Sequence, residues 1–452
     1  MKQFLISSIA SANRRILFCL ILLSIVFDAC KKNDPLPLFG DNGASRYSSD
    51  VIDKWITMQI RLERDATGIP NVAFVRYYSY SGIAAFEALA PGRVSSLSNV
   101  TKWNGLTNLP QPDKFKSSYL PANVNTALAT MNRSIFVNAN TVDKAAIDSL
   151  ENALNASYLS TENADVISRS NAFGQSVADA VFNWSETDGY KNASAAYTPP
   201  IGPGLWVPTA PAFANASTPY WGNNRPIIAG STDNTQPGPP TAYSEDPASP
   251  FYQMAKHVYD ISQTLTPDQI AWAIFWRDIP GVTIGGHWVS ILQQVLKQTN
   301  CHLGKAAFAY AVTGACFNDA SISVFKTKYT YNLVRPITYI RNVMGYTTWN
   351  PVLTTPAHPE YSSAHAVVSA AISDAFTEIF GKIGSFTDHT YDYLGFAPRT
   401  FNSFRDIGID AGNSRLYAGI HYQPSIDTGL EQGRKVTANI FKELDSHSDK
   451  DW

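Results

Sequence analysis

Apolar side chains recur along much of this chain at a spacing of three to four residues, which is typical of one face of an α-helix. Val51, Trp55, Met58 and Leu62 open the series, and similar segments continue to the C-terminal region. No segment alternates apolar and polar residues over a useful length, so the pattern predicts no convincing strand. We therefore expect an all-α fold with a helical bundle as its body.

Local start and stop signals bound the predicted helices. Thr141 is expected to cap the N-terminus of one helix, and Thr266 to Gln269 reads as a capping box with proline at the first helical position. Pro336 is expected to interrupt one long helical stretch. The predicted helices cover a segment starting near Val51 and residues 71–89, 141–159, 166–184, 250–265, 267–276, 285–296, 301–341, 364–380, 412–419 and 429–445.

Residues 196–248 differ in character, because prolines and large aromatic residues replace the helical period there. Trp206, Phe213, Tyr220 and Trp221 lie between the prolines. A flexible linker carries few large aromatic side chains. We therefore expect an ordered Pro-rich loop that wraps over the helical body.

The N-terminal residues have the features of a targeting segment. Lys2, Arg14 and Arg15 form a basic leader, and residues 16–27 form an apolar run that is shorter than the about 20 residues needed to span a bilayer. Cys30 and the polar residues after it resemble the lipidation cysteine and tether of bacterial lipoproteins. A retained N-terminal membrane anchor is the alternative.

These features predict an exported protein that is periplasmic, an outer-membrane lipoprotein or secreted. Contact with a membrane is expected only through a lipid on Cys30. The expected organisation is a signal peptide at residues 1–29, a tether at 30–50 and a helical catalytic domain at 51–445, with the motifs at 250–445.

Charge and cysteine content narrow the classes of function. The net charge is −2 over 452 residues, which gives no overall drive toward nucleic acid or an anionic membrane. We expect no nucleic-acid partner, and a cationic site must be local. Cys301 and Cys316 would be too far apart on one helix to form a disulfide, and no Cys/His spacing is typical of a zinc site.

Three short segments near the C-terminal end supply residue types that bind a tetrahedral oxyanion. Lys328 and Arg335 are seven residues apart, so on one helix both would point the same way. Two such cations repel each other unless an anion lies between them. Ser363 precedes an Ala/Val-rich helix, and a helix N-terminus suits an anion. The segments are Lys328 to Pro336, His358 to His365 and Ser414 to His421.

Each segment taken alone has a simpler explanation. Lys328 and Arg335 could be solvated surface charges, Ser363 could be an ordinary helix cap, and a single histidine such as His421 is more often structural. Tyrosine, leucine and valine residues around the two cations argue against an exposed face. A turn at Gly419 can bring the third segment inward. Together the segments favour a cationic pocket for an oxyanion.

The three segments resemble the motifs of the vanadium-dependent haloperoxidase and type 2 phosphatidic acid phosphatase superfamily. That pattern is Lys, six residues, Arg-Pro; then Pro-Ser-Gly-His; then Ser-Arg, five residues, His, three residues, Asp. Lys328, Arg335 and Pro336 match the first motif fully. In the second motif the serine and the histidine match, whereas Ser362 replaces proline and Ala364 replaces glycine.

The third motif matches except at its last position. Arg415 and His421 are in register, but Ser425 stands where the family has aspartate, and Asp427 follows two residues later. A carboxylate raises the basicity of a ligand histidine more than a hydroxyl does. The change is therefore expected to weaken vanadate binding unless Asp427 reaches the histidine. The Gly-His-Trp run at 286–288 is similar to the bacterial haloperoxidase branch.

The resemblance implies a haloperoxidase/acid-phosphatase-like helical bundle that binds vanadate, or phosphate if the protein is a phosphatase. His421 would bond to the vanadium or attack phosphorus, and His365 would be the acid–base group on the opposite side. His358 falls where bromide-oxidising members carry a second histidine, and Phe325 falls where many relatives have an aromatic residue beside the anion. The groups implied to hold the anion are Lys328, Arg335, Ser363, the Ala364 amide and Arg415.

We expect an exported vanadium-dependent haloperoxidase that oxidises bromide or iodide with hydrogen peroxide and acts on a small organic acceptor. The His358–His365 pair, the large helical body and the absence of predicted membrane helices after residue 30 favour this function. Two alternatives stay open: a soluble acid phosphatase with a phosphohistidine intermediate, and a non-catalytic surface lipoprotein. The sequence leaves room for an oligomer.

Overall fold

The computed structural model describes residues 43–92, 103–113, 115–278 and 281–446. The helices are α2 Asp50–Asp65, α3 Ala73–Glu87, α4 Leu120–Ile135, α5 Thr141–Leu159, α6 Ala164–Ser185, α7 Pro250–Ser262, α8 Pro267–Phe275, α9 Ile284–Gln298, α10 Leu303–Tyr331, α11 Pro336–Asn342, α12 Ala364–Phe380, α13 Phe404–Tyr417 and α14 Gln423–Ser446. The strands are β1 Phe386–Asp388 and β2 Arg399–Phe401.

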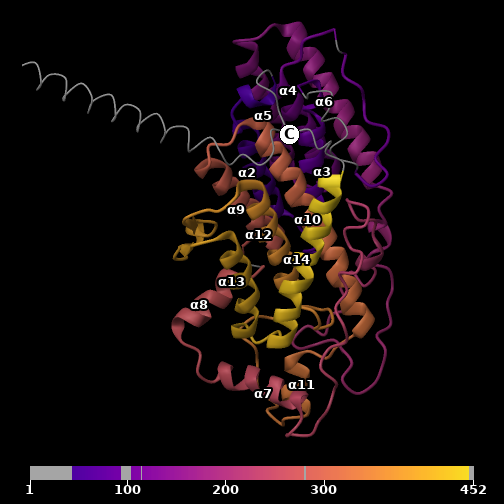
Figure 1. Ribbon diagram of the computed structural model, residues 1–452, viewed down its shortest axis with the longest axis vertical. Coiled ribbons are helices and arrows are strands. Elements are labelled where there is room, and N and C mark those ends of the chain that lie inside the picture. The colour runs from indigo at the N-terminus through magenta and orange to yellow at the C-terminus, as the bar shows by residue number, and fades with distance from the viewer. Residues whose placement is uncertain (1–42, 93–102, 114, 279–280, 447–452) are drawn as a thin grey trace, which may run out of the picture.

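The all-α prediction is confirmed, because within the described residues only β1 and β2 form a sheet. Figure 1 shows an elongated molecule with α4, α5 and α6 at one end and α7 and α11 at the other. Helix α10 runs through the middle and packs against α3, α12 and α14. This central helix carries one of the predicted motifs at its C-terminal end.

Small residues let the central helices approach closely. Gly314 of α10 lies so near α3 that an added Cβ would be 2.6 Å from the Ser79 Cα, and Gly433 of α14 would bring a Cβ within 2.0 Å of the Val367 carbonyl oxygen. Neither position can accept a side chain unless a backbone moves. The close packing buries α10 along most of its length and fixes the ends of α10 and α12 relative to each other.

The helical stretch predicted for residues 301–341 with an interruption at Pro336 breaks earlier than predicted, and the difference matters for the site. Helix α10 ends at Tyr331, and Asn332 adopts a left-handed conformation with φ 48°. Arg335 is extended and sits at the N-cap position of α11. Lys328 and Arg335 therefore do not share a helical face, and the turn between the two helices brings them together instead.

Other helix boundaries also differ from the sequence prediction. Helix α4 was not predicted, since Asn123, Asn125 and Asn132 interrupt its apolar face; their side chains are buried and hydrogen-bond neighbouring groups such as the Ala88 carbonyl. Helix α13 begins eight residues before the predicted start at residue 412. Asn140, not Thr141, caps α5, whereas the capping box at α8 is confirmed.

The Pro-rich segment is an ordered wrap, as predicted. Trp206 and Trp221 are fully buried within it. The Asp319 carboxylate on α10 accepts hydrogen bonds from the main-chain N–H groups of Ile227 and Ile228, at 2.6 and 3.0 Å, and from the Ser231 hydroxyl. These bonds join the wrap to the central helix.

Several predictions concern residues outside the described part of the chain. The signal peptide, Cys19, Cys30 and most of the tether fall there. Within the described part, no helix combines the length and apolar character that crossing a bilayer requires. Cys301 and Cys316 are both buried, and no disulfide joins them, as expected.

Candidate active site

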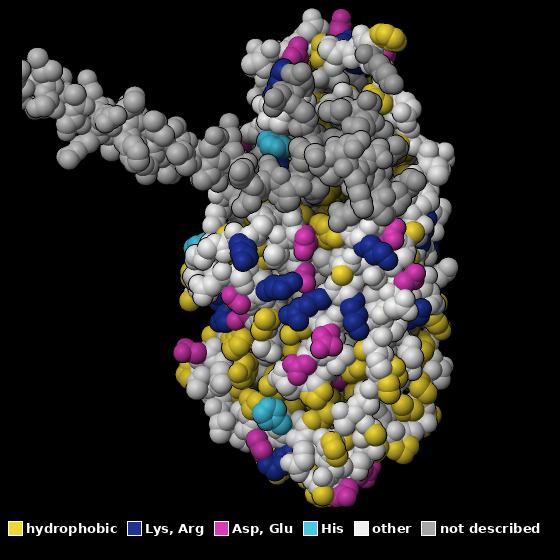
Figure 2. Space-filling view, viewed as in Figure 1, with side chains coloured by type: hydrophobic (Ala, Val, Ile, Leu, Met, Phe, Trp, Pro, Cys, Tyr) yellow, Lys and Arg dark blue, Asp and Glu magenta, His cyan; other side chains and the backbone are white. Residues whose placement is uncertain are grey.

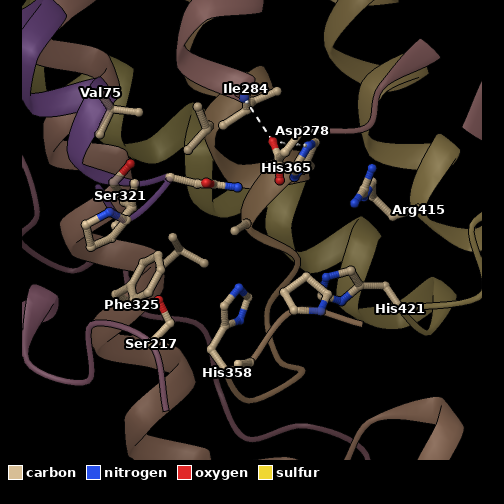
Figure 3. A pocket seen from close by; sticks show the side chains of 18 residues that line it. Val75, Ser217, Asp278, Ile284, Ser321, Phe325, His358, His365, Arg415 and His421 are labelled. Carbon is tan, nitrogen blue, oxygen red and sulfur yellow. Dashed lines mark hydrogen bonds and ion pairs between the residues drawn. The ribbon is translucent and has the colours of Figure 1, made fainter. Parts of the chain in front are cut away.

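The second and third motif segments line one cavity of about 330 Å³, and the first segment lies next to its wall, where the Arg335 Nη1 is 3.3 Å from the His421 Nε2. In Figure 3 the side chains of His358, His365, Arg415 and His421 surround a common space. Phe325 and Ala364 also line it. Lys328, Arg335 and Ser363 are fully buried and are joined to this wall by the hydrogen bonds described below.

Lys328 reaches the site from the last turn of α10. Its ammonium donates hydrogen bonds to the main-chain carbonyls of Pro359 and Glu360, both at 2.9 Å. Burial and the charge of Arg335 hold the Lys328 pKa well below its usual value, and Glu360 opposes this shift. Lys328 therefore ties the loop before α12 to α10 and adds a cation to the site.

Arg335 connects the second and third motif segments. Its Nε and Nη1 donate to the carbonyls of His358 and Ile420, at 2.8 and 2.9 Å. Nη1 also lies 3.3 Å from the His421 Nε2. Burial lowers the Arg335 pKa to about 10, so the guanidinium stays charged at neutral pH.

His421 is oriented by a carboxylate that the motif pattern did not predict. Its Nδ1 lies 2.7 Å from the Glu360 Oε1, which also accepts the Tyr422 N–H at 3.0 Å. Glu360 is fully buried, and burial raises its pKa to about 7 against the lowering effect of Lys328 and Arg335. With Nδ1 engaged by the carboxylate, Nε2 is the ring nitrogen left for a ligand.

Neither residue at the end of the third motif replaces this carboxylate. Ser425 is buried beside Glu360 and lowers its pKa. Asp427 is exposed and accepts a hydrogen bond from the Gln423 amide at 2.8 Å. The expectation that Asp427 could reach His421 is wrong, and Glu360 holds His421 from a different part of the chain.

His358 presents a defined tautomer to the cavity. Arg335 Nη2 lies 2.9 Å from the His358 Nδ1. The same Nδ1 also lies 3.3 Å from the Pro359 carbonyl oxygen, which can only accept. A guanidinium can only donate, and its contact is the shorter, so we assign Nδ1 as the acceptor and the proton of the neutral ring to Nε2. Burial, with Lys328 and Arg335, keeps the His358 pKa well below its usual value. His358 is therefore a neutral N–H donor that lines the cavity.

His365 lies on the first turn of α12, against α8 and α13. The main-chain carbonyl of Trp276 hydrogen-bonds its ring and favours the protonated form, but burial and Arg415 keep the His365 pKa well below its usual value. Its Nε2 has no hydrogen-bond partner and lies 3.6 Å from the Asp278 Oδ1. Asp278, whose pKa burial raises, was not predicted as a site residue.

Arg415 lies near the end of α13, and Gly419, with φ 76°, makes the expected turn from this helix toward His421. The Arg415 Nη1 donates a hydrogen bond to the Trp276 carbonyl at 2.7 Å. Its Nε is buried and has no partner. Burial lowers the Arg415 pKa to about 10, and Asp278 opposes the shift, so this group also remains a cation.

Ser363 and Ala364 form the start of α12. Ser363 occupies the N-cap position, but its side chain makes no capping hydrogen bond, which contradicts the predicted cap. Its Oγ is buried without a partner, while its main-chain N–H donates to the Ser425 carbonyl at 3.1 Å. Ala364 lines the cavity.

The residues present fit a bound oxyanion. Lys328, Arg335 and Arg415 surround one region, and two donor-capable atoms there, the Ser363 Oγ and the Arg415 Nε, are buried without partners. A buried polar group without a partner costs about 1–3 kcal/mol. A four-oxygen anion would accept from both atoms and balance the cations, whereas a neutral ligand would not.

The chain is similar to known proteins in sequence and in fold. Residues 308–450 match the family model described as the VCPO second helical-bundle domain. The first bacterial vanadium-dependent iodoperoxidase of known structure is similar at a TM-score of 0.79 and 32% identity, over 88% of this chain and 96% of that one.

Two structures of bacterial vanadium-dependent chloroperoxidase are similar in fold. The holo form has a TM-score of 0.66 and 16% identity, over 84% of this chain and 92% of that one. The apo form has a TM-score of 0.64 and 15% identity, over 84% and 96%. No curated protein matches the chain by sequence.

Proposed function

Because the chain belongs to the vanadium-dependent haloperoxidase family, we propose that it oxidises bromide or iodide with hydrogen peroxide to hypohalous acid. One observation carries the proposal. His421 lines a cavity bordered by buried cations, and Glu360 fixes its ring through Nδ1, so that Nε2, which lies 3.3 Å from the Arg335 Nη1, is the nitrogen that would bond to vanadate.

The residues that would hold vanadate are those that the motifs indicated. His421 Nε2 would bond to the metal, and Lys328, Arg335 and Arg415 would neutralise its oxygens. The Ser363 hydroxyl and the Ala364 amide would complete the cradle. When bound, vanadate supplies a Lewis acid that activates peroxide without changing its own redox state.

The protein's own groups would manage charge and protons around the anion. Lys328, Arg335 and Arg415 are buried, so they would stabilise negative charge on a bound anion more strongly than exposed cations would. The free Nε2 of His365 can accept a proton from peroxide and return it to the departing oxygen. Asp278, 3.6 Å away, stabilises the protonated ring between these steps.

The cavity wall supports bromide or iodide as the substrate. Much of this wall is apolar, with Phe325 and five aliphatic side chains: Val72, Val75, Ile284, Val324 and Val368. An anion that enters an apolar cavity loses hydration, and this cost falls as the ion becomes larger. The His358 N–H is a donor for such a weakly hydrated anion. The similar bacterial protein of 32% identity is an iodoperoxidase, in agreement with this choice.

Export remains part of the proposal. The basic leader, the apolar run at residues 16–27 and Cys30 support passage across the inner membrane, with a lipid on Cys30 as the one membrane attachment. Mass spectrometry of the mature N-terminus after expression with the native leader tests it. An unprocessed Met1 in the cytoplasmic fraction would contradict export.

The activity is tested on phosphate-free protein loaded with orthovanadate. Peroxide-dependent formation of triiodide and bromination of a phenolic dye are measured between pH 5 and 8, with His421→Ala as the control. We expect turnover of at least one of the two halides, and none in the control. A protein that binds vanadate but oxidises neither halide would refute the proposal. Hydrolysis of a phosphomonoester by the vanadate-free protein would then favour the phosphatase alternative.

A further inference from the structure

A small hairpin between α12 and α13 carries one residue of each of two ion pairs, of which the Asp388–His287 pair is buried and the Arg399–Asp410 pair is partly buried. It consists of β1 and β2, the only strands assigned in the described residues. Asp388 and Arg399 face each other across it as cross-strand partners. Neither residue belongs to the motifs, and neither lines the cavity. Each of them contacts a neighbour of Trp276, the residue at the C-terminal end of α8: Asp388 contacts His287, and Arg399 contacts Asp410.

The Asp388 side supports one face of the Trp276 ring. Asp388 Oδ2 lies 2.7 Å from the His287 Nε2, and both side chains are almost fully buried. The His287 ring stacks on the Trp276 indole, with centroids 4.3 Å apart and an interplanar angle of 21°. Because Asp388 fixes the His287 ring, the indole has a fixed surface to rest on.

The Arg399 side holds the edge of the same indole. Trp276 Nε1 donates to the Asp410 Oδ2 at 2.7 Å. Arg399 Nε donates to that same oxygen at 3.0 Å, and its Nη2 bonds the other carboxylate oxygen. The hairpin therefore fixes the Trp276 ring through two separate routes, stacking at its face and hydrogen bonding at its N–H.

The carbonyl of Trp276 is what the active site uses. Trp276 is the C-cap residue of α8, where main-chain carbonyls lack helical partners. Its oxygen accepts the Arg415 Nη1 at 2.7 Å and also hydrogen-bonds the His365 ring. That second bond uses Nδ1, since Nε2 has no partner. One oxygen atom thus fixes the orientation of both Arg415, which would bind the anion, and His365, the acid–base group.

We propose that Trp276 is a positioning residue for the haloperoxidase reaction, and that Asp388 and Arg399 of the hairpin hold it in place. The carbonyl of Trp276 fixes the direction of Arg415 and leaves the Nε2 of His365 free to face the cavity. This inference rests on the proposed function, because it assigns Arg415 and His365 the roles given there.

The decisive variant is Trp276→Phe, which keeps an aromatic ring but removes the N–H that binds Asp410. Its matched control is Trp55→Phe, since Trp55 is also fully buried and donates to the Asn125 side chain at 2.9 Å, outside the cavity wall. The orthovanadate Kd is measured by calorimetry, kcat and KM at saturating vanadate, and Tm by calorimetric unfolding.

Trp276→Phe is expected to raise the vanadate Kd and to lower kcat, each by roughly tenfold, as is typical of residues that support ligand groups. The KM for peroxide should change less than kcat, and the shift in Tm should match that of Trp55→Phe. A Trp276→Phe protein that equals the Trp55→Phe control in both vanadate Kd and kcat would overturn the inference.

A second pair of variants keeps the test independent of whether Trp276→Phe folds. Asp410→Leu removes the acceptor of the indole N–H. Asp374→Leu on α12 is its control, because Asp374 pairs with Arg405 at 2.7 Å and contacts no tryptophan N–H. Asp410→Leu is expected to weaken vanadate binding and turnover, and Asp374→Leu only stability. Equal effects of the two on vanadate binding would contradict the proposal.

A spectroscopic readout separates failure of this inference from failure of the proposed function. Nitrogen-15 NMR of the histidine rings should show the proton of His365 on Nδ1 in the vanadate-free protein and a shift toward the other tautomer in Trp276→Phe. If the wild type does not oxidise halide but the His365 tautomer still differs between the wild type and Trp276→Phe, only the proposed function is refuted. An unchanged tautomer in Trp276→Phe would refute the positioning role.

Discussion

Replacing Glu360 by glutamine separates the charge of this residue from its shape. Glutamine has nearly the same size, and its amide oxygen can still accept the His421 Nδ1–H and the Tyr422 N–H that Glu360 accepts at 2.7 and 3.0 Å. The fold should therefore persist. What disappears is the negative charge that makes the His421 ring a stronger electron-pair donor.

The expected magnitude follows from the hydrogen bond that changes. A hydrogen bond to a charged group contributes about 1.5–3 kcal/mol, and a neutral one about 0.5–1.5 kcal/mol. The difference of roughly 1.4 kcal/mol corresponds to about tenfold in affinity. Residues that hydrogen-bond the ligands of a metal typically change its affinity by about 10–100-fold, so the two estimates agree at their lower end.

A competing effect has the opposite sign and decides the assay. Loss of the Glu360 carboxylate leaves Lys328 and Arg335 without their counter-charge, which attracts any anion more strongly. Phosphate is held only by charge and hydrogen bonds, so its Kd should change only through this loss of counter-charge. Vanadate also bonds to His421, so its Kd should change through both effects. The ratio of the vanadate Kd to the phosphate Kd therefore isolates the contribution of His421.

Both dissociation constants are measured by calorimetry at pH 8.5, where the Glu360 carboxylate, with a pKa of about 7, is ionised. The ratio should rise at least tenfold in Glu360→Gln and by less than about threefold in the control Ser425→Ala. An unchanged ratio in Glu360→Gln would refute the assignment of Glu360 as the group that orients His421.

Three further predictions use different observables. His365→Ala should retain vanadate binding within about threefold and lose kcat by roughly 10²-fold or more, measured at saturating vanadate; equal loss of binding and turnover would contradict its acid–base role. His358→Phe should lower kcat/KM for bromide more than for iodide, because the smaller anion depends more on the lost N–H; the ratio from parallel assays decides this. Glu63 is buried, and burial raises its pKa to about 7, so the folded state holds its proton more tightly than the unfolded state. Glu63 should therefore contribute roughly 3 kcal/mol to the loss of wild-type stability as pH rises from about 4.5 to about 7. Glu63→Gln should reduce the pH slope in urea unfolding by about that amount; a slope as steep as in the wild type would argue against it.

The sequence was sufficient to predict the fold class, and it indicated several residues that the structure brings to the candidate site. Helical periodicity predicted most of the bundle, and the spacing of Lys328, Arg335, Arg415 and His421 indicated a cationic pocket. Charged residues among apolar neighbours are unusual in a sequence, so these positions could be recognised without a structure. Their convergence on one cavity agrees with the resemblance on which the hypothesis was based.

The remaining groups could not be predicted, for physical reasons. Glu360 lies inside a motif, but its contact with His421 depends on how the loop before α12 meets the loop before α14. Trp276 contacts Arg415 through its main-chain carbonyl. Every residue has such a group, so the residue type at position 276 does not indicate this role. Asp278 precedes α9 without any distinctive spacing. Only the packing of α8, α12 and α13 brings Trp276 and Asp278 to His365.

The central claim is that His421 and the buried cations form one site for vanadate. A crystal structure of the protein soaked with orthovanadate tests it directly. We expect a vanadium atom bonded to the His421 Nε2, with its oxygens in contact with Lys328, Arg335 and Arg415. Vanadate bound elsewhere, or its absence from this cavity at concentrations that support halide oxidation, would contradict it.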